Sequence, residues 1–319
     1  MDPDNQTKVS VFILGGIPNT ARFPFLFFII FTVIYSLTVL GNLLILVTVV
    51  VEPHLHGLPM YFFLCNLSLL DTCLSSVTVP QILVSFIAPS YRAISFGGCV
   101  LQLYAFHFLA STECFLYTVM AYDRYLAICR PLNYTTLMNR RISLGLVTGT
   151  WLTGSFHAAI HTSLTFRLPY CGPNRVNYFF CDIPPVLKLA CADITVNHAM
   201  IRINIALVGT GCFLLICISY AYIASAILKI QTMEGRHRTF STCSAHLTVV
   251  LLYYSPSIFI YMQPASSHAM YGMLAVFYAI ITPMLNPFIY TLRNKEVKRA
   301  LRKLIIGCLI SEKNISLGY

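Results

Sequence analysis

Four charged residues stand in parts of the sequence that otherwise carry only uncharged side chains. Asp71 and Glu113 each interrupt a long uncharged stretch. Two carboxylates in an apolar medium cannot both stay ionised without a cation or a proton. Asp123 and Arg124 follow each other at the end of the next stretch, and an adjacent carboxylate can hold a guanidinium by a charge-assisted hydrogen bond. The first pair predicts a buried sodium or proton site. The second pair places charge where it is expensive, which indicates that it has a function.

Each pair also has a plainer interpretation. The two acids can form a protonated, purely structural hydrogen-bond cluster, and Arg124 can be a snorkelling side chain that anchors a helix end. A proton channel would use such acids, but it would need polar residues above and below them, and the surrounding sequence offers few. Sodium and a shared proton both remain open for Asp71 and Glu113.

Long apolar segments must position these residues. The chain has 319 residues, of which 57% are apolar and 10% charged, whereas a soluble protein is about a quarter charged. A helix needs about 20 mainly apolar residues to cross the hydrocarbon layer, and the short alternating segments of a barrel are absent from this sequence. The pattern predicts an all-α membrane protein, a seven-transmembrane helix bundle with helices at 24–50, 58–86, 97–129, 142–164, 198–228, 238–262 and 270–292.

Helical rise places the two acids at similar depth. At ~1.5 Å per residue, Asp71 lies ~20 Å along its helix and Glu113 lies ~16 Å from Arg124. Both acids are therefore expected near the membrane midplane, and Arg124 at the cytoplasmic end of its helix.

Basic residues set the orientation of the bundle. Of the 21 Lys and Arg residues, seven lie from 293 to 313 on the same side as seven earlier ones, Arg124, Arg130, Arg140, Arg141, Lys229, Arg236 and Arg238. The positive-inside rule makes that side cytoplasmic and places the amino terminus outside. This asymmetry accounts for the net charge of +10 and gives little support to nucleic-acid binding.

The chain divides accordingly into an extracellular amino terminus (1–23), a transmembrane domain (24–292) and a cytoplasmic tail (293–319). Asn5 begins a glycosylation sequon on the outer side, and the first 20 residues lack the pattern of a cleavable signal peptide. In the tail, apolar and basic residues interleave from Asn294 to Ile306, which predicts an amphipathic helix on the anionic inner leaflet. Cys308 is a candidate for palmitoylation.

Four of the twelve cysteines fall on the oxidising outer side, namely Cys99, Cys171, Cys181 and Cys191. Four cysteines allow three pairings, and spacing alone does not choose among them. Free thiols are the alternative. The cysteines inside the predicted helices are expected to pack as small apolar side chains.

Several motifs then occur in the order found in one family. They are Gly41-Asn42, LHGLPMYFFLCNLSLLD at 55–71, MAYDRYLAIC at 120–129, Ser219-Tyr220, RTFSTCSAHL at 238–247 and PMLNPFIYTLRNKEV at 283–297. Over essentially its whole length, the chain resembles the olfactory receptors, a branch of the rhodopsin-like G-protein-coupled receptors. Two small departures are Arg238-Thr239 where Lys-Ala is usual and Tyr254-Ser255 where Tyr-Gly is usual.

The resemblance implies a plasma-membrane odorant receptor of sensory cilia that activates a stimulatory, olfactory-type G protein and raises cyclic AMP. It implies the disulfides Cys99–Cys181 and Cys171–Cys191, and it favours sodium near Asp71, with Asn42 and Asn286 as network partners. It also implies that outward motion of the sixth helix exposes Arg124. The switch residues carried over from the family are Asp123, Arg124, Tyr125, Tyr220, His246, Asn286, Pro287 and Tyr290.

Helical spacing and family position together predict an apolar ligand cavity with a few hydrogen-bonding groups, which is typical of a small-molecule site. Its expected lining is Leu103, Phe106, His107, Ala110, Ser111, Asn204, Val208, Ser257, Tyr261, Val276 and Ala279. No acid lies in the outer part of helix 97–129 to balance an amine, and no lysine between 239 and 292 can form a retinal Schiff base. A volatile or semi-volatile neutral organic compound is the expected ligand. A helix-packing role is an equal interpretation for His107.

Other function classes fit less well. A transporter would usually show inverted repeats and matched broken helices. A membrane enzyme would need a nucleophile–base set or a metal motif such as HExxH, and the sequence has none. The chain is therefore expected not to be an enzyme and to need no cofactor apart from a structural sodium ion. A rhodopsin-like receptor for a non-odorant metabolite is the nearest alternative.

Overall fold

The structure is a computed structural model. It describes residues 9–17, 20, 22–88, 92–262, 268–294, 296–304 and 306, without the side chains of 56, 238, 242, 257–262, 268–271, 292 and 293. The predicted sites Asn5 and Cys308 lie outside the described residues, as do the side chains of Ser257 and Tyr261.

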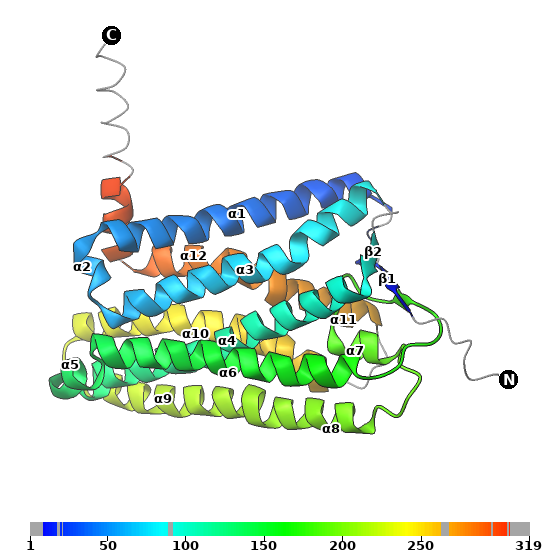
Figure 1. Ribbon diagram of the computed structural model, residues 1–319. Helices are drawn as coiled ribbons and strands as arrows, with labels where there is room; N and C mark the ends of the chain where they lie inside the picture. The colour runs from blue at the N-terminus through cyan, green and yellow to red at the C-terminus, as the bar shows by residue number, and fades with distance from the viewer. Residues whose placement is uncertain are drawn as a thin grey trace, which may run out of the picture.

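Seven long helical stretches lie side by side along the molecule in the described part of the chain (Figure 1). Four are single helices early in the chain: α1 (Pro24–Val51), α3 (Pro59–Ile87), α4 (Phe96–Cys129) and α6 (Arg140–Phe166). The fifth is α8 (Thr195–Asn204), the π-helical segment η4 (Ile205–Thr210) and α9 (Gly211–Leu228). The last two are α10 (Met233–Met262) and the run of α11 (His268–Val276), π-helical η5 (Phe277–Ile281) and α12 (Thr282–Arg293).

These helices overlap the seven predicted segments, and α10 begins at Met233 rather than at 238. Local sequence explains several starts. Proline opens α1 and α3, where its missing N–H costs nothing. Ser95 caps α4 by accepting the Gly98 N–H at 3.0 Å, and the Asn139 side chain caps α6 in the same way.

Five stretches are long and apolar enough to cross a membrane by length and composition: α1, α3, α4, the stretch Thr195–Leu228 and Gly272–Thr291. The 27 residues of α6 and the 30 of α10 also have the length to cross, but these two helices are more polar. In α6 several polar side chains face the bundle, because Thr150, His161 and Thr165 are buried. These polar side chains of α6 are therefore shielded from the lipid.

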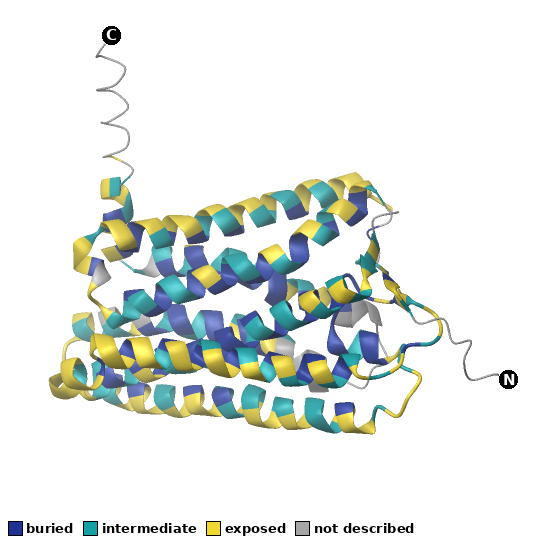
Figure 2. Cartoon of the chain, in the orientation of Figure 1, coloured by how far each residue is buried: buried dark blue, intermediate teal, exposed yellow. Residues whose placement is uncertain are grey.

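Burial follows the inward faces of the helices, while large apolar side chains cover the outer faces (Figure 2). Phe25 on α1, Phe156 on α6 and Leu207 on η4 are all exposed. This inverted distribution is expected of a bundle whose outer solvent is hydrocarbon, since lipid tails offer no reason to hide apolar groups.

At Gly154 the helix α6 packs directly against the backbone of α4. A Cβ atom on Gly154 would overlap Thr112 Oγ1 and lie 3.0 Å from the Thr112 amide nitrogen and 3.1 Å from the Phe108 carbonyl oxygen. Gly149 lies in the same helix, and a Cβ there meets nothing within 4 Å. Gly154 is therefore the point that fixes the separation of α4 and α6.

A small three-stranded sheet covers the extracellular end. Its central strand β1 (Val11–Leu14) pairs antiparallel with β2 (Ala93–Ser95) and parallel with β3 (Arg175–Val176). Phe12 of β1 is fully buried, with its ring 5.9 Å from that of Phe96 and 5.7 Å from that of Tyr170. We call this sheet, with the short helix α7 (Ile183–Leu187) and the two disulfides, the extracellular cap. No pattern in the sequence predicts its strands.

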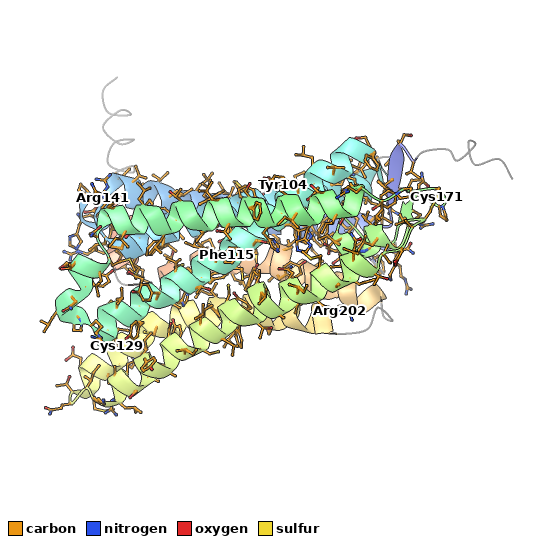
Figure 3. The ribbon with its side chains drawn as sticks, turned by 60° about the horizontal axis from the view of Figure 1, so that its bottom comes forward. Tyr104, Phe115, Cys129, Arg141, Cys171 and Arg202 are labelled. Atoms are coloured by element: carbon orange, nitrogen blue, oxygen red, sulfur yellow. A yellow bond between two sulfur atoms is a disulfide. The ribbon has the colours of Figure 1, made fainter. Side chains whose placement is uncertain are left out.

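The disulfides join Cys99 to Cys181 and Cys171 to Cys191, the pairing that the family resemblance implies. The first ties the loop that follows α6 to the start of α4. In Figure 3, Cys171 and Arg202 lie at this end of the bundle, while Cys129 and Arg141 lie at the opposite, cytoplasmic end.

The cytoplasmic end carries three short helices, α2 (Pro53–His56), the 3-10 turn η3 (Pro131–Asn133) and α5 (Tyr134–Leu137). Beyond α12, residues 296–304 form a further helix, capped by Asn294 Oδ1, which accepts the Glu296 N–H at 3.0 Å. Val297 is buried against the bundle, and Lys303 contacts Glu52 at 3.1 Å. The tail therefore has the two-sided character that its sequence predicts.

Candidate functional site

A cavity of about 100 Å³ lies between the outer halves of the helices. It is smaller than the ~300–1,000 Å³ of drug-sized sites, so it suits a small ligand. Six of the predicted ligand-binding residues line it, namely Phe106, His107, Ala110, Ser111, Asn204 and Val208. Its lining also includes Cys114, His157, Ile205, Gly209, Thr210, Tyr253, Tyr254 and Tyr278.

Three other predicted ligand residues do not line this cavity. Leu103 and Ala279 are fully buried among other side chains, and Val276 is likewise absent from the lining. Helical spacing assigns a residue to a face, but neighbouring side chains decide whether that face meets a cavity or a packed core.

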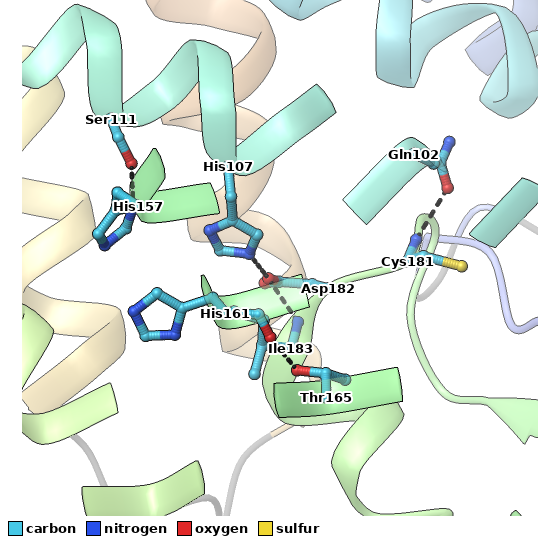
Figure 4. Close-up of polar contacts among 9 residues, drawn as sticks. All are labelled: Gln102, His107, Ser111, His157, His161, Thr165, Cys181, Asp182 and Ile183. Atoms are coloured by element: carbon cyan, nitrogen blue, oxygen red, sulfur yellow. Dashed lines mark hydrogen bonds and ion pairs between the residues drawn. The ribbon is translucent and has the colours of Figure 1, made fainter. Parts of the chain in front are cut away.

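His157 is the most informative residue that sequence reasoning missed. It lies on α6, which contributes no residue to the predicted pocket, yet it faces the cavity beside Ser111 (Figure 4). A signal existed, because His157 and His161 are two histidines one helical turn apart and therefore lie on the same face of the helix. Their rings lie 4.7 Å apart on the inner side of α6.

A hydrogen-bonded chain crosses the cavity wall. Ser111 Oγ lies 2.8 Å from His157 Nδ1, and His157 Nε2 lies 2.7 Å from Asn204 Oδ1. The three side chains come from α4, α6 and α8, so this chain links three helices around one wall. We call it the Ser111–His157–Asn204 chain.

The extracellular cap is fastened above the same cavity. Asp182 Oδ1 lies 3.0 Å from His107 Nε2 (Figure 4), and both residues are buried. The Cys181 N–H donates to Gln102 Oε1 at 2.9 Å, next to the Cys99–Cys181 disulfide. Because Asp182 also accepts the Ile183 N–H at 2.8 Å, His107 holds the start of α7 over the cavity.

The two predicted acids meet below the cavity. Asp71 and Glu113 are fully buried, and their partners Asn286 and Tyr117 connect them, because the Asn286 amide lies 3.4 Å from the Tyr117 hydroxyl oxygen. The Asn286 amide donates to both Asp71 oxygens, at 3.0 and 2.9 Å. Tyr117 donates its hydroxyl to Glu113 Oε1 at 2.6 Å. Glu113 Oε2 and Asn286 Oδ1 have no hydrogen-bond partner in the described residues.

The predicted ion pair between Asp123 and Arg124 does not form. Asp123 Oδ1 instead accepts the Tyr134 hydroxyl at 2.7 Å, and the Arg124 guanidinium donates to the sulfur of Met60. Neighbouring residues on a helix point ~100° apart, so a residue and its immediate successor do not face each other. Asp123 therefore joins α4 to α5, and Arg124 contacts α3.

The remaining switch residues lie in several parts of the inner half of the bundle. The Tyr220 hydroxyl lies 2.8 Å from His246 Nδ1, with the two rings stacked. Tyr290 is buried, and Tyr125 packs with the apolar cluster of α9 and α10. Pro287 lies against α1, where a Cβ on Gly41 would approach its ring to 3.1 Å.

The seventh helix is irregular around its two prolines. The π-helical segment η5 ends two residues before Pro283, and Pro287 follows within α12. The Phe277 carbonyl accepts both the Thr282 N–H and, at 3.1 Å, the Thr282 hydroxyl. Pro287 has no N–H to donate to the Pro283 carbonyl one turn earlier, and Asn42 of α1 donates to that carbonyl at 3.1 Å instead.

Tyr134→Phe is expected to destabilise the cytoplasmic end. Burial and the neighbouring Asp123 raise the pKa of Tyr134, so the phenol keeps its proton and donates it. Removing the hydroxyl leaves buried Asp123 without that donor, at a cost of about 1–3 kcal/mol. We expect the Tm of the detergent-solubilised protein to fall by at least about 3 °C. The exposed Tyr122→Phe is the matched control, and an equal Tm for the two variants contradicts the proposed tie.

Comparison with known proteins confirms the family resemblance. Residues 31–307 match the family model described as olfactory receptor. The chain is 61% identical to human Olfactory receptor 10S1 over 94% of this chain and 91% of that protein. It is 56% identical to human Olfactory receptor 10G7, over 97% of this chain and 99% of that protein. It is also 56% identical to human Olfactory receptor 10G4, over 94% and 96% respectively.

The match extends over most of the chain and agrees with the helical bundle, the apolar outer surface and the two disulfides. Members of this family are G-protein-coupled, multi-pass plasma-membrane receptors with seven transmembrane helices, and they are not enzymes. The chain therefore belongs to the olfactory receptor family and is an odorant receptor.

Proposed function

We propose that the receptor binds a small, mostly apolar organic odorant in the cavity between its outer helix halves. Binding activates a stimulatory, olfactory-type G protein and raises cyclic AMP. The observation that carries this proposal is the cavity itself, with aromatic walls and a few convergent hydrogen-bonding groups. Its two π-helical borders, η4 and η5, support a role in switching, since such segments are frequent at functional sites.

A continuous set of contacts supports signal transfer from the cavity to the cytoplasmic end. Tyr253 lines the cavity, and its ring lies 5.2 Å from that of Tyr117. The Tyr117 ring lies 6.1 Å from His246, which contacts Tyr220. Side chains packed in this way can pass a rearrangement between sites when the elements that carry them have two arrangements.

The acid cluster fits either a sodium ion or a shared proton. Its unpartnered atoms, Glu113 Oε2 and Asn286 Oδ1, are oxygen acceptors, which a hard cation prefers. When bound, sodium would be held by Asp71, Glu113 and Asn286 and would supply a positive charge to the two carboxyl groups. A proton shared between Asp71 and Glu113 would lower the charge of the pair in the same way.

Raising the sodium concentration is expected to weaken agonist potency. A cation that prefers the inactive receptor must oppose any ligand that prefers the active one. We expect the double variant Asp71→Asn, Glu113→Gln to lose this sensitivity in agonist titrations on membranes.

Coupling of this kind typically changes affinity by about 5–150-fold. A response to pH but not to sodium would assign the site to the shared proton. Agonist affinity that is flat in sodium and between about pH 5 and pH 8 would leave the acids as a structural cluster.

The proposed function as a whole is tested in cells that express the receptor with a stimulatory G protein and a cyclic AMP reporter. A panel of small volatile compounds is expected to contain agonists with saturable dose–response curves. Cells without the receptor serve as the control. A receptor that reaches the surface, binds panel compounds and raises no cyclic AMP would contradict the proposed coupling.

A further inference from the structure

The Ser111–His157–Asn204 chain fixes the direction of its hydrogen bonds. A neutral imidazole has one N–H and one acceptor nitrogen. Asn204 presents its Oδ1 to His157 Nε2 at 2.7 Å, and a carbonyl oxygen only accepts, so Nε2 carries the hydrogen. His157 Nδ1 is then the acceptor, and the Ser111 hydroxyl, 2.8 Å away, must donate to it.

The neutral form of His157 follows from its surroundings. Its ring lies 4.7 Å from that of His161, and the hydrogen-bond partners of its two nitrogens, Ser111 and Asn204, are both uncharged. A positive imidazolium in this apolar interior would lack the carboxylate that such a charge requires. The tautomer with hydrogen on Nε2 therefore describes the resting cavity.

The direction of these hydrogen bonds determines which donors and acceptors the cavity wall presents to a ligand. The Ser111 proton is committed to His157, so the serine oxygen meets the cavity through a lone pair. The Asn204 oxygen is committed to His157, so its amide nitrogen is the group that can still donate. The wall thus presents one acceptor and one donor on residues that both line the cavity.

Three further polar groups of the lining also hydrogen-bond within the protein. Tyr253 donates its hydroxyl to the Ala110 carbonyl at 2.8 Å, and the Tyr254 hydroxyl lies 2.8 Å from Cys114 Sγ. His107 Nε2 donates to Asp182, because Asp182 is an acceptor. The protons of Tyr253 and of His107 Nε2 are therefore not available to a ligand that can only accept.

We propose that this receptor selects ligands carrying a hydroxyl group, which donates to Ser111 Oγ and accepts from the Asn204 amide. This inference rests on the proposed use of the cavity as the odorant site. An ether, ester or ketone of the same shape accepts from Asn204 but leaves the Ser111 oxygen without a donor. His157 is a positioning residue here, since it sets the polarity of Ser111 and binds the ligand only through it.

The size of the discrimination follows from one hydrogen bond. A neutral bond contributes about 1 ± 0.5 kcal/mol, and an acceptor left unpaired adds to that loss. We therefore expect an alcohol to bind at least about tenfold more tightly than its methyl ether.

The test measures binding and cyclic AMP separately on the full-length receptor. The probes are two matched pairs, cyclohexanol with methoxycyclohexane and benzyl alcohol with benzyl methyl ether. Binding is read by the thermal shift of purified receptor, and the alcohol-to-ether affinity ratio is the quantity compared. We expect a ratio of at least about ten in the unmodified receptor.

Three variants connect the ratio to the hydrogen-bonded chain. His157→Phe removes the acceptor for the Ser111 proton and is expected to bring the ratio below about three. Asn204→Asp supplies the carboxylate that favours a charged His157, whose Nδ1–H would donate to Ser111 and release the serine proton for an ether oxygen. This variant is therefore expected to bring the ratio toward one without reversing it. His161→Phe removes the neighbouring ring without touching the chain and is the control, with an unchanged ratio.

Each outcome decides the inference. A ratio near one in the unmodified receptor, a preference for ethers, no binding by any probe, or a preference that Asn204→Asp reverses would overturn it. Alcohol-selective binding without cyclic AMP would support the inference and contradict the proposed G-protein coupling. Cyclic AMP responses that do not distinguish alcohols from ethers would support the proposed G-protein coupling and contradict the inferred selectivity for alcohols.

Discussion

Gly154→Ala is expected to remove the receptor from the cell surface. The added Cβ would overlap Thr112 Oγ1 and press on the Thr112 amide and the Phe108 carbonyl. The two backbone atoms belong to α4 and cannot rotate away, so the helices themselves must separate. Overpacking of this kind typically lowers the stability of the folded protein by about 1–3 kcal/mol. Because the neighbouring atoms belong to a rigid backbone, we expect a destabilisation near the upper end of this range. We expect surface staining to fall at least about fivefold.

Gly149→Ala supplies the matched control, because it makes the same change one and a half turns away on α6, where a Cβ meets nothing within 4 Å. In a helix it should be neutral or slightly stabilising. The double variant Gly154→Ala, Thr112→Ala removes the side-chain overlap and should recover part of the surface level. Equal staining for Gly154→Ala and Gly149→Ala would show that α4 and α6 do not depend on this contact.

Arg124→Ala is expected to abolish the cyclic AMP response while leaving ligand binding intact. The half-buried Arg124 guanidinium is held by the weak sulfur acceptor of Met60 rather than by a carboxylate. A side chain held so lightly can be released to a partner at the cytoplasmic end. Losing a charged contact at an interface costs about 2–5 kcal/mol, so coupling should weaken by more than about 30-fold.

Arg130→Ala is the control for charge at the same end of the receptor, since Arg130 is exposed at the C-cap of α4. Its response should match that of the unmodified receptor. Surface level and ligand-induced thermal shift are measured for both variants, so that misfolding is separated from uncoupling. A normal response from surface-expressed Arg124→Ala would end the assignment of this arginine to the switch.

The long helices could be predicted from the sequence because a membrane-spanning helix requires only a sufficiently long run of apolar residues. Uncharged runs placed α1 and α3 to within one residue at each end, without any knowledge of their neighbours. The sequence-based depth estimate also brought Asp71 and Glu113 together, because rise along a helix is nearly constant.

Contacts that depend on where a side chain points around its helix could not be predicted from the sequence. The pairing of Asp123 with Tyr134 and of Arg124 with Met60 depends on where side chains point around α4 and on what α3 and α5 bring near. His157 was passed over because a pocket was assigned to certain helices by family position. A histidine in an apolar run is ambiguous until its hydrogen-bond partners are known.

The strand β1 shows a different limit. All four of its residues, Val11–Leu14, are apolar, so the sequence has no alternation of polar and apolar side chains to mark a half-buried strand. The strand exists because β2 and β3 present backbone partners on both sides, and those partners lie far away in the chain.

That distance has a consequence for how the receptor is made. The partners of β1 are Ala93–Ser95 and Arg175–Val176, and chains grow at about 5–20 residues per second. The amino-terminal segment must therefore wait on the order of ten seconds or more in the lumen before its second partner has been synthesised. The Cys99–Cys181 bond becomes available at almost the same moment. The antiparallel pair of β1 and β2 can form early, whereas the pairing with β3 and the Cys99–Cys181 bond become available together, so the extracellular cap is completed late in synthesis.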